Sequence, residues 1–298
     1  MTPLMRIFVT TCLLTMACNQ INAQAQEANE MQSLHWVINT APPFHILEGQ
    51  YAGQGICDVL IDVLDDALPE LATKRTVLPQ TRIRQQFQRN ENQCFPCMIY
   101  RPIPGETIQS EPTHFYAPHG IITTQEKAEQ ITQQHGNPVR LGSLVHDRNF
   151  RFGYPAGRHY PALHDILEQA RQSHLNPVAH SGENATVAIL SMIKKNRIDY
   201  TIEYQILQQF DHKTTDDSPL VFLEIAETQD QYVLGAIGCT NNAWGEAAIK
   251  HINRVLPQVQ QHPDFLDVQD LWFTDKVGNQ EYRQLLQQRV WHTAEDHP

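Results

Sequence analysis

The sequence predicts an α/β protein of two lobes, built from mixed and mainly parallel sheets. Short apolar strands alternate with helices whose apolar residues recur every three or four positions. This alternation occurs in two series, one ending near residue 123 and the other beginning near residue 151. A polar, glutamine-rich stretch at residues 125–137 separates them. The 298 residues are enough for two lobes with separate cores.

The first series begins with a predicted strand at residues 34–39 and a proline-containing loop at 41–44. The next helix starts at Ile56, because apolar residues from there to Leu71 fall on one helical face, and Pro69 marks its end. The remaining predicted elements of this series are a strand at 76–78, a helix at 81–88, and strands at 97–100 and 120–123.

The second series contains a predicted helix that begins at Pro161, a residue suited to the first turn. Strands that alternate with helices usually pair in parallel, so this pattern predicts mainly parallel sheets. A cleft between two such lobes is a common place for a small ligand. The predicted elements are strands at 151–153, 198–202, 221–225 and 232–239, a loop at 154–158, and helices at 161–172, 185–195 and 245–260.

Residues 1–25 have the features of an export signal. Arg6 supplies the positive region, and residues 7–17 form an apolar run shorter than the roughly 20 residues needed to cross a bilayer. Residues 23–25, Ala-Gln-Ala, offer a cleavage site. A poor lipobox ends at Cys18, so lipid attachment there is the alternative. We therefore expect a periplasmic protein.

Composition and motifs exclude several classes of function. With 22 basic and 33 acidic residues the formal charge is −11, which argues against a general binder of nucleic acid or anionic membranes. No Gly-x-Ser-x-Gly, His-Glu-x-x-His or phosphate-loop motif is present, so we expect no enzyme and no cofactor. His114 and His119, like His159 and His164, are five residues apart, which does not match helical metal ligands, and we expect no metal site.

Four cysteines follow the predicted signal, an even number in an oxidising compartment. Two of them, Cys94 and Cys97, have CxxC spacing. They lie beside a predicted strand, where residues three apart point to opposite faces, so we do not expect them to bond to each other. The other two are Cys57 and Cys239, and from the residues alone the pairing stays open.

The order of the motifs resembles the family 3 extracellular solute-binding proteins, which have the type II periplasmic-binding-protein fold. A stand-alone subgroup opens with W…PPF…G-x-G…D, which corresponds here to Trp36, residues 42–44, residues 53–55 and Asp58. The resemblance extends over residues 33–275. Its further motifs are Leu68-Pro69, Arg82, Cys94, Ser110-Glu111-Pro112, Gly153, Gly157-Arg158-His159-Tyr160, Arg197-Ile198-Asp199-Tyr200, Gly245, Pro263 and Leu271-Trp272.

The resemblance implies a chain that crosses twice between its lobes, near His119 and Gln231. Lobe 1 would comprise residues 33–118 and 230–298, the latter including C-terminal helices, and lobe 2 would comprise residues 119–229. Small hinge motions at the two crossing strands would open and close the lobes.

The same resemblance places Cys94 and Cys239 together in lobe 1 and so implies a disulfide bond between them. Cys57 and Cys97 would then form the remaining pair or stay free.

The resemblance also implies non-catalytic capture of a small polar solute between the lobes, for transport. The expected partner is an inner-membrane permease, and the protein is expected to be a monomer. The alternative is a sensory protein that signals to a membrane partner, and an enzyme is the weaker alternative. The candidate ligand-binding residues are Phe44, Gly53, Asp58, Arg82, Ser110, Arg158, Tyr160 and Glu203.

Each candidate has a functional and a structural interpretation. Arg158 precedes a helix N-terminus and could hold a carboxylate or phosphate, so the sequence predicts an anionic ligand; the alternative is a surface arginine. Phe44 could present its ring to a ligand or pack in a core, and Gly53 could allow close approach or form a plain turn. Asp58 could contact a ligand or stabilise its helix, and Arg82 could lie on a solvated face.

Amino-acid-binding members of the family carry an arginine that grips the ligand carboxylate. Gly105 stands near that position here, and Arg101 is the possible replacement. Glu203 is the candidate for the acidic residue that holds the ligand ammonium group. These departures put an unmodified amino-acid ligand in doubt.

Overall fold

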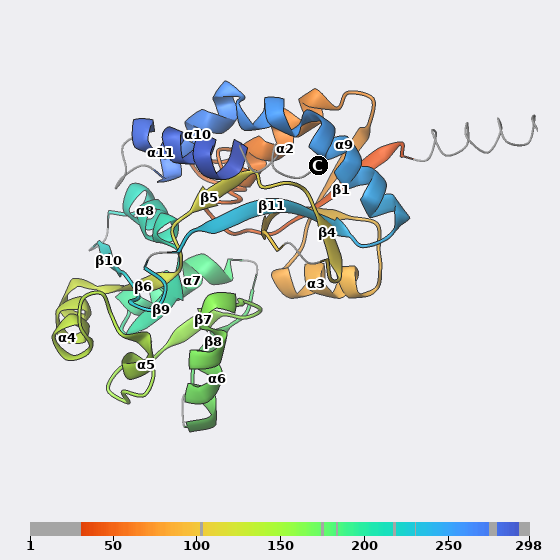
Figure 1. Ribbon diagram of the computed structural model, residues 1–298. Coiled ribbons are helices and arrows are strands. Elements are labelled where there is room, and N and C mark those ends of the chain that lie inside the picture. The colour runs from red at the N-terminus through yellow and green to blue at the C-terminus, as the bar shows by residue number, and fades with distance from the viewer. Residues whose placement is uncertain are drawn as a thin grey trace, which may run out of the picture.

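The computed structural model describes residues 31–101, 104–173, 176–182, 184–216, 219–229, 231–273 and 279–291. The predicted export signal and Cys18 lie outside the described residues. Figure 1 shows two bodies, which we call the large lobe and the small lobe, each with its own sheet. The predicted two-lobed α/β class is confirmed.

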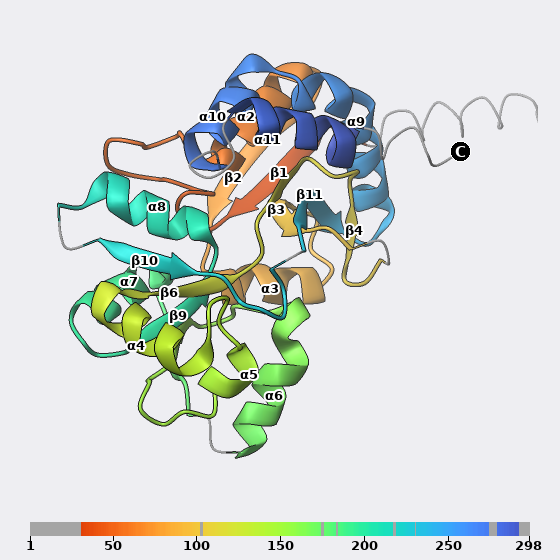
Figure 2. The same ribbon diagram turned by 60° about the vertical axis from the view of Figure 1, so that its left-hand side comes forward.

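The large lobe is built around a sheet of six strands in the order β2-β1-β3-β11-β4, with β5 also paired to β11. Helix α3 lies on one side of this sheet, and α2 with the C-terminal helices lies on the other (Figures 1 and 2). The strands are β1 (Ser33–Ile38), β2 (Ala72–Val77), β3 (Cys94–Ile99), β4 (Thr107–Gln109), β5 (His114–Tyr116) and β11 (Val233–Thr240). The helices are α2 (Ile56–Ala67), α3 (Gln80–Gln88), α9 (Ala243–Gln260), α10 (Pro263–Phe273), α11 (Asn279–Leu286) and a final π-helix (Gln287–Trp291).

The small lobe contains a three-stranded sheet in the order β10-β6-β9 and a separate pair, β7-β8. Helix α8 lies between the three-stranded sheet and the large lobe (Figure 1). The strands are β6 (Gly120–Thr124), β7 (Gly153–Pro155), β8 (Val178–His180), β9 (Tyr200–Glu203) and β10 (Leu220–Leu223). The helices are α4 (Gln125–His135), α5 (Leu141–Leu144), a 3₁₀ turn (Pro161–Leu163), α6 (His164–Ser173), α7 (Ala185–Lys194) and α8 (Gln205–Thr214).

The sheets contain less parallel pairing than the sequence predicts. Strands β2 and β3 are parallel to β1, and β7 is parallel to β8. Strand β11 runs antiparallel to β3, β4 and β5, and β6 runs antiparallel to β9 and β10. The parallel rule applies to a strand–helix–strand unit within one sheet. Because β11 enters its sheet from the other lobe, the rule does not govern its direction.

The polar stretch at residues 125–137, expected from the sequence to separate the lobes, is mostly helix α4 within the small lobe. Thr124 caps it by accepting a hydrogen bond from the Lys127 amide at 3.3 Å. Its buried face consists of Ala128, Ile131 and His135, while the glutamines face outward. A single narrow apolar stripe is enough to hold a helix whose other residues are polar.

The core of the large lobe lies between its sheet and helices α2, α9 and α10. The fully buried rings include Trp36, Phe265 and Trp272. Both tryptophan N–H groups find acceptors: Trp36 donates to Asp65 at 3.0 Å, and Trp272 donates to the carbonyl of Gln54 at 2.8 Å. These bonds satisfy the only polar atom of each buried indole.

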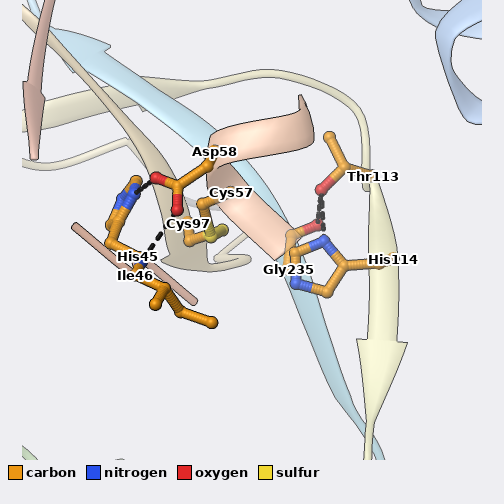
Figure 3. The surroundings of a disulfide bond; sticks show 8 residues. All are labelled: His45, Ile46, Cys57, Asp58, Cys97, Thr113, His114 and Gly235. Carbon is orange, nitrogen blue, oxygen red and sulfur yellow. Dashed lines mark hydrogen bonds and ion pairs between the residues drawn. A yellow bond between two sulfur atoms is a disulfide. The ribbon is translucent and has the colours of Figure 1, made fainter. Parts of the chain in front are cut away.

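Strand β5 approaches β11 so closely that only glycine fits opposite one buried ring. A Cβ on Gly235 would lie 2.4 Å from the His114 imidazole. Thr113 fixes this contact by donating to the Gly235 carbonyl at 3.1 Å and pairing with His114 Nδ1 at 2.8 Å (Figure 3). Burial lowers the pKa of His114 to about 3, so this ring is neutral in the core.

Two disulfide bonds hold the large lobe together. Cys94 on β3 is bonded to Cys239 on β11, at positions that face each other across the two strands. This is the pairing that the family resemblance implied. Cys57 on α2 is bonded to Cys97 on β3 (Figure 3). The two cysteines of the CxxC sequence therefore have different partners, as the strand geometry predicts.

The two bonds should contribute unequally to stability. The sequence separations are 145 residues for Cys94–Cys239 and 40 residues for Cys57–Cys97. In the chain-entropy account, loss of the longer loop should cost about 1 kcal/mol more, out of about 2–5 kcal/mol for each bond. Denaturant unfolding of the two double cysteine-to-alanine variants checks this. A larger loss for the Cys57/Cys97 variant would contradict the entropic account.

Candidate functional site

The N-terminus of α2 holds the loop that carries Phe44. The backbone N–H groups of Ile56 and Cys57 donate to the carbonyls of Pro43 and Phe44 at 3.0 and 2.9 Å. A Cβ on Gly55 would lie 2.5 Å from the Phe44 carbonyl oxygen, so glycine is required for this approach. The first N–H groups of this helix are therefore bound to the loop and are not an anion site.

Asp58 fastens the same loop from the side. Its carboxylate accepts from the Ile46 amide at 2.8 Å and contacts His45 Nδ1 at 2.7 Å (Figure 3). Asp58 and His45 are both buried. The structure thus gives Asp58 a structural role, and its carboxylate is not free for a ligand.

Three aromatic rings meet where the two lobes join. Phe44 packs with its ring centroid 5.6 Å from that of Tyr116 on β5 and 6.0 Å from that of Tyr204. The Tyr116 and Tyr204 centroids are 4.7 Å apart. Phe44 and Tyr116 belong to the large lobe, whereas Tyr204 follows β9 of the small lobe. This group, which we call the aromatic cluster, bridges the lobes.

A buried ion pair lies beside the aromatic cluster. Arg158 contacts the Glu203 carboxylate through Nε at 2.7 Å and Nη2 at 2.6 Å. The Glu203 side chain is 1% exposed and the Arg158 side chain 23% exposed, so part of the arginine side chain is accessible. The Arg158 guanidinium carbon lies 5.8 Å from the Tyr204 ring centroid. The pair brings together two of the ligand-binding residues predicted from sequence.

The two members of this pair influence each other's pKa. Burial alone would lower the pKa of Arg158, but the charge of Glu203, the neighbouring Tyr204 and Tyr160, and the hydrogen bond to Glu203 together raise it. Burial raises the pKa of Glu203, and the Arg158 charge opposes that rise. A buried carboxylate without its arginine would be strongly disfavoured.

His119 and Tyr160 add two buried polar atoms next to the ion pair. The His119 ring stacks on Tyr204 with centroids 3.9 Å apart and lies edge-on to Tyr160 at 5.1 Å. Both residues are at least nine-tenths buried. Neither His119 Nε2 nor the Tyr160 hydroxyl has a hydrogen-bond partner in the described part of the chain.

Both of these groups are uncharged at neutral pH. Burial, and then the charge of Arg158, hold the pKa of His119 well below 6.5. Burial, and then the charge of Glu203, raise the pKa of the Tyr160 hydroxyl well above 10. The site therefore combines one balanced ion pair with two neutral hydrogen-bonding groups and an aromatic wall.

The other residues predicted from sequence lie outside this group. Ser110 is buried, and its hydroxyl donates to the Glu111 carbonyl and accepts from the Ile237 amide. Gly53 is an exposed turn residue with φ +75°, and its N–H donates to the Ile46 carbonyl. Arg82 is exposed on α3, and Arg101 is exposed after β3. In the described part of the chain, no hydrogen bond, ion pair or ring contact joins any of these four residues to the aromatic cluster.

Sequence reasoning missed Tyr116, His119 and Tyr204 as site residues. His119 was considered only as a metal ligand and as a place where the chain crosses between lobes. Tyr204 was not singled out from the sequence. Tyr116 ends β5, His119 lies between β5 and β6, and Tyr204 follows the end of β9. Positions at strand ends between two lobes are the signal that could have identified them.

A second contact between the lobes lies at the edge of the site. Arg84 of α3 donates from Nη1 to His159 Nε2 at 2.8 Å. Next to it, Gly157 adopts φ +87° and its backbone faces Thr81 of α3. An acceptor nitrogen on His159 requires a neutral imidazole.

Comparison with solved structures shows the same architecture at low sequence identity. A putative L-cystine ABC transporter protein from Listeria monocytogenes matches 82% of this chain and 96% of its own, with TM-score 0.62 and 12% identity. A substrate-binding protein of an ABC uptake transporter from Streptococcus pneumoniae, with bound histidine, matches 85% and 96%, with TM-score 0.60 and 13% identity. A histidine kinase sensor domain similar to periplasmic binding proteins matches 82% and 97%, with TM-score 0.60 and 8% identity.

This is the fold of the periplasmic binding proteins. No known family profile matches the chain, and no curated protein matches it. The likeness of this chain to these solved structures therefore shows its fold.

Within the described ranges, no group of three or more His, Cys, Asp or Glu residues could hold a metal ion. No helix in those ranges is long and apolar enough to cross a membrane.

Asp58 should be required for stability, because it is a buried acceptor for the loop that positions Phe44. We expect Asp58→Ala to lower the free energy of unfolding by about 2 kcal/mol, since a buried N–H group loses a charged partner. Asp66→Ala on the exposed face of the same helix is the matched control and should change it by less than about 0.5 kcal/mol. Denaturant unfolding measures both, and equal losses would contradict the assignment.

The Arg84–His159 contact should make the joining of the lobes pH-dependent. Partial burial, and then the charges of Arg84, Arg101, Arg158 and His164, lower the pKa of His159 below 6.5. Joined lobes therefore favour the neutral ring, so the contact is fully present above pH 6.5 and weakens as pH falls below it. We expect the radius of gyration, measured by small-angle scattering, to increase between pH 7.5 and pH 5.

His159→Gln keeps an acceptor that does not titrate in this range. We expect the variant to show a smaller change in radius of gyration over the same interval. An identical pH response in the variant and the wild type would assign the effect to other groups.

Proposed function

We propose that this protein binds a small polar solute between its two lobes, without chemical conversion, in the periplasm. The observation that carries the proposal is the junction of the lobes, where a buried ion pair and two unpartnered polar atoms lie under aromatic rings from both lobes. Buried polar atoms normally have hydrogen-bond partners, and a bound ligand supplies them at such sites.

The lobe boundaries expected from the sequence belong to this proposal. We assign residues 33–118 and 230–298 to lobe 1 and residues 119–229 to lobe 2. In support, strands before residue 117 and after residue 232 share the six-stranded sheet, whereas β6, β9 and β10 form the other. Closure about the two crossing segments would enclose a ligand against residues of both lobes.

The ligand proposed here carries both charges. The sequence predicts an anionic ligand from Arg158, but Glu203 balances that charge at 2.6 Å. A purely anionic ligand would meet the carboxylate as well as the guanidinium. A zwitterion can place its carboxylate on the accessible part of Arg158 and its ammonium group toward Glu203. Histidine bound to the Streptococcus protein is a ligand of that class, so an amino acid is the substrate class that we propose.

We place this protein with an ABC importer. The comparison with transporter-associated binding proteins supports this role. The likeness to a histidine kinase sensor domain supports the second candidate, in which ligand binding signals to a membrane partner. Both functions use the same site, and growth on the identified ligand after gene deletion separates them: an importer is needed for uptake, whereas a sensor is not.

The Arg158–Glu203 ion pair should be required for ligand binding, and this requirement should be separate from its contribution to stability. The purified protein is first screened against the twenty L-amino acids by thermal shift, and hits are measured by calorimetry. We expect Arg158→Ala to weaken binding at least about 10-fold, because a charged hydrogen bond to the ligand is lost. It should also lower stability by about 3 kcal/mol, because Glu203 is left buried and unpaired.

The double variant Arg158→Met/Glu203→Leu separates the two effects. It removes both charges, so stability should return toward that of the wild type while binding stays lost. Arg171→Ala, which removes an exposed arginine of the same lobe, is the control and should leave affinity unchanged. Recovery of binding in the double variant, or no hit in the screen of the wild type, would overturn the proposed function.

A further inference from the structure

Two buried polar atoms of the site remain unused by the ion pair. His119 Nε2 and the Tyr160 hydroxyl are buried, and their rings are 5.1 Å apart between centroids. Tyr160 follows the Gly157-Arg158 turn, and His119 belongs to the segment that crosses from β5 to β6. These residues therefore come from separate parts of the chain and meet beside Arg158 and Glu203.

Both atoms are costly to bury without partners. An unsatisfied donor or acceptor in a protein interior costs about 1–3 kcal/mol. A phenylalanine at position 160 would keep the ring and avoid that cost. The presence of a hydroxyl at that position is explained if something outside the chain bonds to it.

We infer that His119 and Tyr160 are the specificity-determining residues of the site and bind an uncharged polar side chain of the ligand, a carboxamide or a hydroxyl. This inference rests on the proposed function, because it assumes an amino acid held by Arg158 and Glu203. The tyrosine O–H donates a hydrogen bond, and a neutral imidazole nitrogen can accept one. A carboxamide or hydroxyl both donates and accepts, so it satisfies the two atoms together.

The alternatives fit less well. A cationic side chain would lie beside the Arg158 guanidinium, whose charge already suppresses protonation of His119. An aliphatic side chain would leave both buried atoms unpartnered. A site built to form hydrogen bonds rejects an analogue that lacks the bonding group, because its own polar atoms then stay unsatisfied.

Isosteric pairs of amino acids test the inference directly. L-asparagine and L-leucine have the same branched shape, as do L-threonine and L-valine, and L-glutamine and L-serine complete the polar set. We expect the wild type to bind at least one polar member and to bind its apolar isostere at least about 10-fold more weakly.

Tyr160→Phe removes only the hydroxyl, and His119→Phe replaces the imidazole by a somewhat larger aromatic ring that cannot form these hydrogen bonds. Each should weaken binding of the preferred polar amino acid about 3- to 10-fold, the loss expected for one net hydrogen bond, and leave the apolar isostere unaffected. The midpoint of thermal unfolding without ligand should stay the same or rise, because a buried unsatisfied atom is removed. A residue with a merely structural role would not weaken affinity while preserving or raising stability.

Tyr200→Phe is the matched control. Tyr200 also has a buried hydroxyl without a partner among the described residues, but it lies three positions before Glu203 on β9 and stacks on Phe152 at 5.3 Å. Residues three apart on a strand point to opposite faces, so its hydroxyl is directed away from Glu203. We expect unchanged affinity in this variant.

The outcomes separate the inference from the proposed function. If the wild type binds L-leucine or L-valine as tightly as its polar isostere, or if Tyr160→Phe binds the polar ligand as well as the wild type, the inference is wrong and the proposed function stands. If the wild type binds none of the twenty amino acids, the proposed function is wrong and the inference falls with it.

Discussion

The large lobe depends on a strand that arrives from the far end of the chain. Strand β11 lies between β3 and β4 and also pairs with β5, so three of the other five strands of this sheet bond to it. Two features fix β11 against its neighbours: Gly235 allows close contact with His114 of β5, and a disulfide bond joins Cys239 to Cys94 of β3. Without β11 the sheet would be left with an open edge at β3, and β4 and β5 would lose the strand with which they pair.

The path of the chain out of the large lobe and back into it also brings the residues of the candidate site together. A chain that leaves the large lobe after β5 and re-enters at β11 must pass between the lobes, and His119 lies on the outward passage. The aromatic cluster is contributed from the loop before α2, from β5 and from the end of β9. Arg158, Glu203 and the Tyr160 hydroxyl add polar atoms from the small lobe, and His119 adds another from the crossing segment. The large lobe thus contributes aromatic rings, whereas the small lobe contributes the ion pair as well as the Tyr204 ring.

The fold class and helices α2, α3, α6, α7 and α9 could be predicted from the sequence, because most of these helices carry apolar stripes that need no tertiary information. Helices α5, α8, α10 and α11 were not predicted individually. Strands β4, β5 and β8 were not predicted. They are three residues long, and their order depends on pairing with distant partners rather than on local pattern. The glutamine-rich helix α4 was missed because its stripe has few apolar residues.

Part of the candidate site could be predicted from the sequence. Phe44, Arg158, Tyr160 and Glu203, which lie near one another in the structure, were singled out because glycines, prolines or a predicted strand mark their positions. The roles of Asp58 and Ser110 could not be decided from the sequence, because a buried polar side chain that bonds to backbone looks the same in sequence as one that awaits a ligand. The charge of the site could not be predicted from Arg158 alone, because its partner Glu203 lies 45 residues away.

The position of β11 also affects how the chain acquires its cross-links during synthesis. Three of the four cysteines of the large lobe, at positions 57, 94 and 97, emerge from the ribosome long before the fourth, at 239. The strands of the small lobe are complete by residue 223, so that lobe can fold while the sheet of the large lobe still lacks β11. If Cys94 is oxidised before Cys239 has been synthesised, the thiols available to it are those of Cys57 and Cys97, and neither is its native partner. Correct cross-linking then requires thiol–disulfide exchange after Cys239 has been made.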